Sequence, residues 1–267
     1  MNPWICRVCA AVLFVLSVPA MAAECPRIVS QSPYLTRVLD WLGRGDCVVG
    51  VSRYERGREA LPRTGGVRDP DTLAIDALEP DLVLISRGSD ARLLAADLAP
   101  STRIVQVDGF ESMAATESML RTVAQASGAA EGSARVDAFA RDWRTAARKV
   151  EGESLRALVL SACSGEPYSF GRGHVVGDLF SHAGFEVVET LPRIRHLRAG
   201  EELPDILSAV ARFQPDVVIS LNRTTAEHCN AQLGMLPVRL VMLTGEHFFQ
   251  PGPDMLQGLA ELAERIK

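Results

Sequence analysis

The sequence predicts an α/β protein made of two Rossmann-like lobes with parallel central sheets, joined by a single long backbone helix. Three observations predict this fold. Strand-like apolar runs alternate with amphipathic helical patterns in both halves of the 267-residue chain, which is typical of parallel sheets covered by helices. The phrase "LEPDLVLIS" at 78–86 returns in similar form as "FQPDVVISL" at 213–221. One long helical pattern separates the two halves.

Residues 1–22 have the pattern of a secretory signal peptide. Arg7 precedes an apolar run, and Ala20 and Ala22 form an A-x-A arrangement at its end. The run is too short for a retained membrane span, so cleavage is expected after Ala22. The mature protein is therefore expected in the periplasm, as a monomer.

Four of the six cysteines remain after cleavage, and none form a C-x-x-C pair. An even cysteine count in an exported chain favours disulfides over metal sites. Three pairings are possible. We expect Cys25–Cys47 and Cys163–Cys229, because each pair then falls within one half of the chain.

The first lobe is expected over residues 23–128. Its strand patterns are "RIVSQS", "CVVGVS", "DLVLIS" and "RIVQVD", and its helical patterns include "YLTRVLDWLG" and "ARLLAADLA". Pro80 marks the end of a helix ahead of an apolar strand, because the residue before a proline disfavours the helical conformation.

A linking helix is expected over residues 129–152, with Phe139 and Trp143 on its apolar face. About 20 residues at 1.5 Å per residue reach roughly 30 Å, the length of a two-lobe body. A helix of this length would join the lobes as a stiff strut.

The second lobe is expected over residues 153–267, with the strand patterns "RALVLSA", "FEVVE", "DVVISL" and "RLVMLT". Pro215 stands before one of these strands as Pro80 does in the first lobe. Open α/β lobes bind ligands beyond the carboxyl ends of their strands. Two facing lobes therefore predict a ligand cleft between them.

Charge and motifs exclude several classes of function. The formal net charge of −5 argues against a general nucleic-acid binder. A G-x-S-x-G elbow is absent, so no hydrolase or other enzyme is expected. The glycines of "SFGRGHVVGDLF" at 169–180 do not match the dinucleotide fingerprint and are interpreted as a turn ahead of a helix.

The order and spacing of these segments resemble the periplasmic binding proteins of ABC importers for vitamin B12, haem and ferric siderophores. The resemblance covers essentially the whole mature chain. It is carried by "RIVSQSPYLTRVLDWLG", "VVGVSRY", "LPRTGGVRDPDTLAIDALEPDLVLIS", "GRGHVVGDLFSHAG" and "FQPDVVISL". It implies a solute-binding protein without enzymatic activity that delivers a small-molecule chelate to an ABC permease.

The sequence departs from the family at the permease-docking positions. Members usually carry a glutamate in each lobe about seven residues before the Pro-Asp phrase, and here Leu73 and Ser208 stand there. Asp71 in the first lobe, and Glu201 and Glu202 in the second, could supply the same charge. A periplasmic sensor or cofactor chaperone without a permease partner stays an alternative.

Loops at the expected strand ends are rich in arginine and contain several aromatic residues. Arginine presents a planar fork of donors that matches carboxylates and phosphates, and aromatic rings supply flat apolar area. The candidate ligand-binding residues are Arg53, Tyr54, Arg68, Arg87, Tyr168, Phe170, Arg172, Arg193, Arg195, Arg223, His247 and Phe248.

This composition favours an anionic metal chelate as the ligand. Tryptophan is scarce in the mature chain, which favours a ferric siderophore over cobalamin or haem. His247 beside Glu246 could contact a metal directly, but no histidine pair has the spacing of a metal site. Whether the protein itself ligates a metal stays open.

Overall fold

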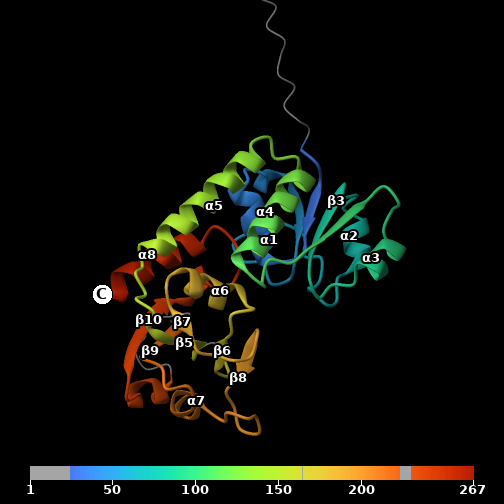
Figure 1. The fold of residues 1–267 in the computed structure, drawn as a ribbon. Coiled ribbons are helices and arrows are strands. Elements are labelled where there is room, and N and C mark those ends of the chain that lie inside the picture. Colours follow the sequence, from blue (N-terminus) through green and yellow to red (C-terminus); the bar gives the residue numbers. More distant parts are fainter. Residues whose placement is uncertain (1–24, 164, 223–229) are drawn as a thin grey trace, which may run out of the picture.

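The structure is a computed structural model that describes residues 25–163, 165–222 and 230–267. Its first lobe contains a four-stranded sheet in the order β2-β1-β3-β4 (Figure 1). All strand pairs of this sheet are parallel, as the sequence predicts. The strands are β1 (Ile28–Ser30), β2 (Val48–Val51), β3 (Leu82–Ser86) and β4 (Arg103–Val107).

Helices cover both faces of the first sheet. Ile75 and Leu94 on α2 and α3 belong to a small core on one face, whereas α1 and α4 pack on the other with the main core. The helical elements are α1 (Pro33–Trp41), η1 (Gly45–Cys47), α2 (Thr72–Asp76), α3 (Ala91–Asp97) and α4 (Met113–Ser127). Side chains cap three of these helices, which fixes where each begins: Asp71, Asp90 and Ser112.

The second lobe contains a six-stranded sheet in the order β10-β9-β5-β6-β8, with β7 paired to β5. Strands β5, β7, β9 and β10 form the expected parallel core. The short strands β6 and β8 extend it with antiparallel pairs that the sequence analysis did not predict. The strands are β5 (Arg156–Ser161), β6 (Tyr168–Phe170), β7 (Glu186–Val187), β8 (Ile194–His196), β9 (Val217–Asn222) and β10 (Arg239–Thr244).

The helices of the second lobe also divide between two faces. α7 packs on the outer face around Ile206 and Val210, whereas α6 and α8 join the main core on the inner face. The helical elements are α6 (Val175–His182), α7 (Ile206–Phe213), η2 (Ala231–Met235), η3 (Gly245–His247) and α8 (Met255–Arg265).

The linking helix is α5 (Gly132–Arg148), which is shorter at both ends than the expected 129–152. Its 17 residues span about 25 Å. α5 contacts α4 of the first lobe and both α6 and α8 of the second, and it runs along one flank of both lobes (Figure 1). The helix ends at Arg148, and the chain then turns through Glu151, Glu153 and Ser154, which have positive φ.

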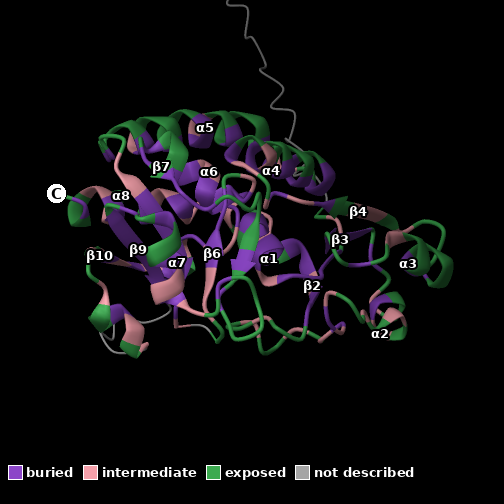
Figure 2. Ribbon diagram, turned by 60° about the horizontal axis from the view of Figure 1, so that its bottom comes forward, coloured by how far each residue is buried: buried purple, intermediate pink, exposed green. Residues whose placement is uncertain are grey.

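The two lobes share one hydrophobic core along the inner side of α5. This core contains Leu84 of the first lobe, Phe139 and Trp143 of α5, and Leu179 and Val159 of the second lobe. Figure 2 shows α5 with exposed residues outward and buried residues on its inner side. The domain boundaries at 128/129 and 152/153 stay a prediction, because the core itself does not divide there.

A disulfide joins Cys25 to Cys47, as expected, with a Cα–Cα distance of 5.3 Å. Cys229, the expected partner of Cys163, lies outside the described residues, and so does the expected signal peptide. Within the described part of the chain, no helix combines the length and apolar character that a membrane crossing needs.

Candidate functional site

Two neighbouring cavities lie where the loop after β2 approaches the loop after β10. They measure about 490 and 520 Å³ and share Arg37, Arg56, Glu246 and Gln250. The first lobe therefore contributes residues from α1 and the β2 loop, and the second contributes residues that follow β10. These cavities lie where a cleft is expected between the strand ends of two α/β lobes, and they are therefore the candidate cleft.

Most charged groups of these cavities are already paired. Arg37 Nε lies 3.3 Å from Asp254 Oδ2, and Arg37 also bonds to Gln250. The guanidinium of Arg56 has no hydrogen bond or ion pair to any described residue, and Tyr54 is 58% exposed. Arg56 and Tyr54 are thus groups that the β2 loop offers to a ligand, together with Glu55, which lines the same cavity and has a buried Oε2 without a partner among the described residues.

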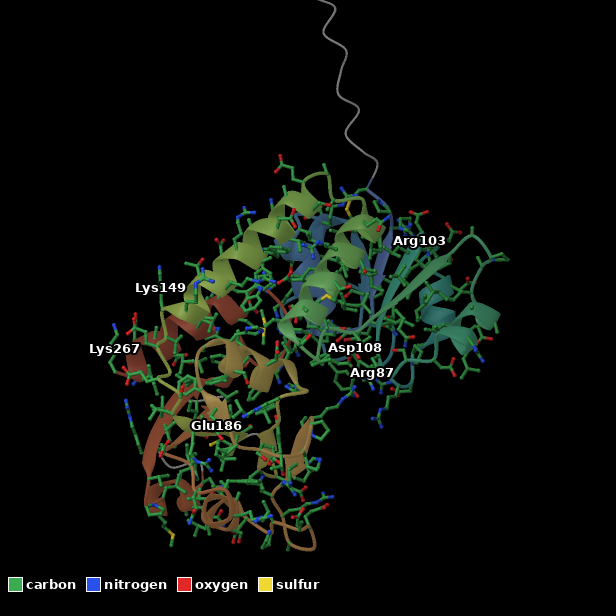
Figure 3. All side chains as sticks on the ribbon, viewed as in Figure 1. Arg87, Arg103, Asp108, Lys149, Glu186 and Lys267 are labelled. Carbon is green, nitrogen blue, oxygen red and sulfur yellow. A yellow bond between two sulfur atoms is a disulfide. The ribbon has the colours of Figure 1, made fainter. Side chains whose placement is uncertain are left out.

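A second set of charged groups joins the lobes at the other edge of the first sheet, after β3 and β4 (Figure 3). Arg87 Nη1 donates to Asp108 Oδ2 at 2.8 Å and to Glu111 Oε1 at 3.2 Å. Arg193 of the second lobe pairs with the same Glu111 oxygen. We call Arg87, Asp108, Glu111 and Arg193 the cross-lobe cluster. Two cationic side chains from separate lobes converge in it on one carboxylate.

The electrostatics of the cross-lobe cluster act on two ionisable groups. Burial opposes ionisation of Asp108, but the N–H of Phe110 and the guanidinium of Arg87 outweigh it and lower the pKa of Asp108 below its ordinary value. Burial, assisted by the positive charge of Arg193, lowers the pKa of His174 to about 4. His174 is therefore neutral at pH 7, and its Nδ1 accepts the N–H of Val176 at 3.2 Å as the cap of α6.

Aromatic residues beside this cluster form a packed seam between the lobes. The ring of Phe110 lies edge-on to Tyr34 at 5.4 Å and 6.3 Å from His174. The N–H of Val175 donates to the carbonyl of Phe110 at 2.8 Å, and Met113 N–H donates to Asp178 at 2.8 Å. The lobes are thus held together here by direct hydrogen bonds as well as by α5.

The structure places only some of the expected ligand residues on the cleft surface. Tyr54, Arg87, Arg193 and His247 line the cavities or the cross-lobe cluster. Phe170 and Phe248 are corrections to the sequence analysis, since they are 2% and 0% exposed. The ring of Phe248 packs against the backbone of Gly258 on α8, where any Cβ would collide with it.

The remaining expected residues have other surroundings. Arg53 pairs with Asp69, and Tyr168 is half-buried at the start of β6. Arg68 is exposed and bonds to no described residue. Arg223 lies outside the described residues.

Two arginines of the second lobe point to places other than the cleft. Arg172 Nε donates to the Val187 carbonyl at 3.1 Å, in a cavity of about 560 Å³ that also contains Arg156 and Arg212. Arg195 is buried, and its Nε lies 3.0 Å from Glu189. The structure therefore corrects the assignment of both residues to the cleft. The local sequence pattern places each residue in a loop or near a strand end, but it does not predict the direction in which the side chain points.

The expected docking acids each have a partner on this chain. Asp71 caps α2 by accepting the Ala74 N–H at 3.0 Å. Glu202 pairs with Arg195, and Glu201 pairs with Arg198 at 3.2 Å. Leu73, at the position of the usual family glutamate, is 84% exposed. Any contact with a permease through these acids would start from carboxylates that are exposed but already paired.

Sequence reasoning missed the residues that complete the site. Arg56 follows Tyr54 within "SRYERGRE", so the same strand-end argument could have found it. Arg37 lies inside a helix and Glu111 just before one, and no local signal marks either. In the described part of the chain, no three His, Cys, Asp or Glu side chains gather closely enough to hold a metal ion.

Comparisons with known proteins identify the family to which this architecture belongs. A family described as "Periplasmic binding protein" matches residues 28–226. A comparison with curated protein sequences gives no match. Among solved structures, the chain is similar to the vitamin B12 binding protein BtuF of Vibrio cholerae, at 17% identity and a TM-score of 0.70 over 91% of this chain and 96% of that one.

Two further solved structures have the same fold. The haem-binding protein RhuT of Roseiflexus sp. RS-1 is 22% identical, with a TM-score of 0.67 over 91% of this chain and 98% of that one. The siderophore binding protein BauB, bound to ferric iron and two acinetobactin molecules, is 14% identical, with a TM-score of 0.68 over 90% and 94%. Because the family match spans most of the chain and includes strands from both lobes, this chain belongs to the periplasmic binding protein family.

Proposed function

We propose that this chain captures an anionic iron chelate, a ferric siderophore, in the periplasm for import by an ABC permease. The observation that carries the proposal is the convergence of Arg87 and Arg193, one from each lobe, on a single anionic group between the lobes. Arginine forks of this kind recognise carboxylate, catecholate and phosphate oxygens. The proposal assigns the chain no enzymatic activity.

The described aromatic residues support a chelate over a flat macrocycle. A corrinoid or porphyrin is usually covered by exposed rings, but Phe170 and Phe248 are buried here. Tyr54 is the one exposed ring among the described residues that line these cavities, and the half-buried Phe249 lines the second of them. Cobalamin and haem, the ligands named for BtuF and RhuT, are therefore the second choice within the same fold.

Delivery to a permease would use Asp71, Glu201 and Glu202 as the docking acids. A second candidate function, a periplasmic sensor or cofactor chaperone, is favoured by the exposed Leu73 at a usual docking position. The import function and the sensor or chaperone function are distinguished by measuring ATP hydrolysis by the importer, reconstituted in liposomes, with and without this protein. A docking protein stimulates ATP hydrolysis, and its Glu201→Gln/Glu202→Gln variant does so less; a sensor leaves the rate unchanged.

The binding proposal is tested by calorimetry on arginine variants of the mature chain. Arg87→Ala and Arg193→Ala should each weaken binding of a ferric siderophore by at least about tenfold, since charge-assisted hydrogen bonds contribute roughly 1.5–3 kcal/mol. Arg→Lys should restore only part of the affinity, because the forked geometry is lost.

Arg172→Ala is the matched control, because Arg172 is exposed but lines the cavity with Arg156 and Arg212. It should bind within about twofold of the parent. Equal affinity for all three alanine variants would mean that the cleft arginines are solvated surface.

A further inference from the structure

We infer that Glu111 sets the charge selectivity of the cleft. Its carboxylate occupies the position between Arg87 and Arg193 that an anionic group of the ligand takes on binding. This inference rests on the proposed function, since it assumes that the cleft receives an anionic ligand. It adds an acidic residue to the candidate binding site, which the proposed function assigns to arginines alone.

The geometry of the cross-lobe cluster carries the inference. Glu111 Oε1 lies 3.2 Å from Arg87 Nη1 and pairs with Arg193 Nη2, so one oxygen joins both lobes. Among the described residues, Arg193 has no other side-chain hydrogen bond or ion pair. Glu111 is thus the only carboxylate that contacts Arg193 directly within that part of the chain, although the charge of Asp108 also acts on Arg193 from nearby. Glu111 has the chemistry of a ligand carboxylate.

Glu111 is held more weakly than Asp108, its neighbour in the cluster. Asp108 accepts the Phe110 N–H at 3.0 Å in addition to Arg87, and its side chain is 25% exposed. Glu111 is held by the two arginines alone among described groups, and its side chain is 53% exposed. Exposed ion pairs stabilise little. A ligand oxygen can therefore replace Glu111 at small cost, while Asp108 keeps Arg87 in place.

The consequence is a filter on ligand charge. An anionic ligand regains the two guanidinium contacts that Glu111 gives up, whereas a neutral ligand that displaced Glu111 would leave Arg193 without a carboxylate contact and Arg87 with Asp108 alone. Unpaired charges removed from water are costly. Loss of the Glu111 charge should therefore strengthen the binding of anions, and it should leave the binding of neutral ligands unchanged or weaken it.

Inorganic phosphate tests this without knowledge of the natural ligand. The mature protein, Glu111→Gln, and Glu111→Gln/Arg193→Ala are titrated with phosphate by calorimetry at low ionic strength, since salt screens exposed charges. Glu111→Gln should bind phosphate about tenfold more tightly than the parent, because one close negative charge is removed. Arg193→Ala in that background should abolish the gain.

The matched control is Asp137→Asn. Asp137 is exposed to a similar extent and also pairs with an arginine, Arg121, at 2.7 Å. It lies on α5, outside the cross-lobe cluster. Asp137→Asn should bind phosphate within about twofold of the parent. A gain equal to that of Glu111→Gln would show a net-charge effect and overturn the assignment.

A second arm uses ferric citrate on the same variants. A phosphate gain without ferric citrate or siderophore binding by any variant contradicts the proposed function and leaves the Glu111 assignment standing. Chelate binding that is equal in the parent and Glu111→Gln, together with no phosphate gain, overturns the assignment and leaves the proposed function standing. Tighter binding of both probes by Glu111→Gln supports both.

Discussion

The indole of Trp143 on α5 donates a hydrogen bond of 2.8 Å to Glu117 on α4. Both side chains are buried, and Arg144 also lies 2.8 Å from the same carboxylate. A buried charge is stable only when such partners compensate its loss of hydration. This contact fixes the linking helix to the first lobe and, through it, the spacing of the two lobes.

Glu117→Ala should lower the free energy of unfolding by about 2 kcal/mol, because the buried indole N–H and Arg144 lose their acceptor. Urea denaturation measures the change. Asp137→Ala is the control, since Asp137 is an exposed partner of Arg121 at 2.7 Å, and it should cost less than about 0.5 kcal/mol. Equal losses of unfolding free energy for both variants would show that the buried Trp143–Glu117 contact stabilises the protein no more than an exposed ion pair does.

The lobes should move little when a ligand binds. Closure by a hinge would have to bend α5 and break the Val175–Phe110 hydrogen bond at the seam. Small-angle X-ray scattering with and without saturating ferric siderophore should therefore give the same radius of gyration within error. A contraction as large as that of receptors with flexible hinges would contradict this.

His174 should make stability depend on pH. Its folded pKa of about 4 lies below the unfolded value near 6.5, so the unfolded chain binds more protons between these values. The contribution is complete above about pH 6.5 and is lost as the pH falls towards 4, by about 3 kcal/mol at most.

His174→Asn isolates this effect. Asparagine can still cap α6 but does not titrate. Unfolding free energies of parent and variant, measured from pH 7.5 to 4, should differ in slope, with the parent losing more stability on acidification. Carboxylates away from His174 contribute equally to both curves, whereas the charge of Asp108 acts on His174 and partly opposes the lowering of its pKa. Parallel curves would mean that His174 is not held neutral by its surroundings.

The Cys25–Cys47 disulfide should stabilise the mature protein by about 2–4 kcal/mol, mainly because it restricts the unfolded chain. Cys25→Ser/Cys47→Ser should show this loss in urea denaturation. Peptide mapping of the non-reduced protein should recover the Cys25–Cys47 link together with the expected Cys163–Cys229 link. Cross-links between the halves would disprove the expected pairing.

The fold was largely predictable because its signals are local. Pro80 and Pro215 stop helices ahead of β3 and β9, and both strands are fully buried apolar runs. β6 and β8 were missed because three-residue strands such as Tyr168–Phe170 have too few residues to show an alternating pattern.

The candidate site was only partly predictable, since side-chain direction depends on distant partners. Phe248 follows a strand end like a cleft residue, but Gly258 on α8 leaves space for its ring in the core. Arg172 likewise has a partner that its local sequence does not reveal, since its Nε donates to the Val187 carbonyl. Glu111 acquires its role from Arg193, 82 residues away, and no sequence period encodes such a pair.

The most direct test of the central claim is a fluorescence titration of the mature protein against four ligands: a ferric catecholate siderophore, ferric citrate, haemin and cyanocobalamin. The buried Trp143 and the partly buried Trp41 serve as reporters. The account predicts saturable one-to-one binding of the ferric siderophore or ferric citrate, at least about tenfold tighter than binding of haemin or of neutral cyanocobalamin. Tight binding of haemin or cyanocobalamin, with no binding of the siderophore or of ferric citrate, would contradict it.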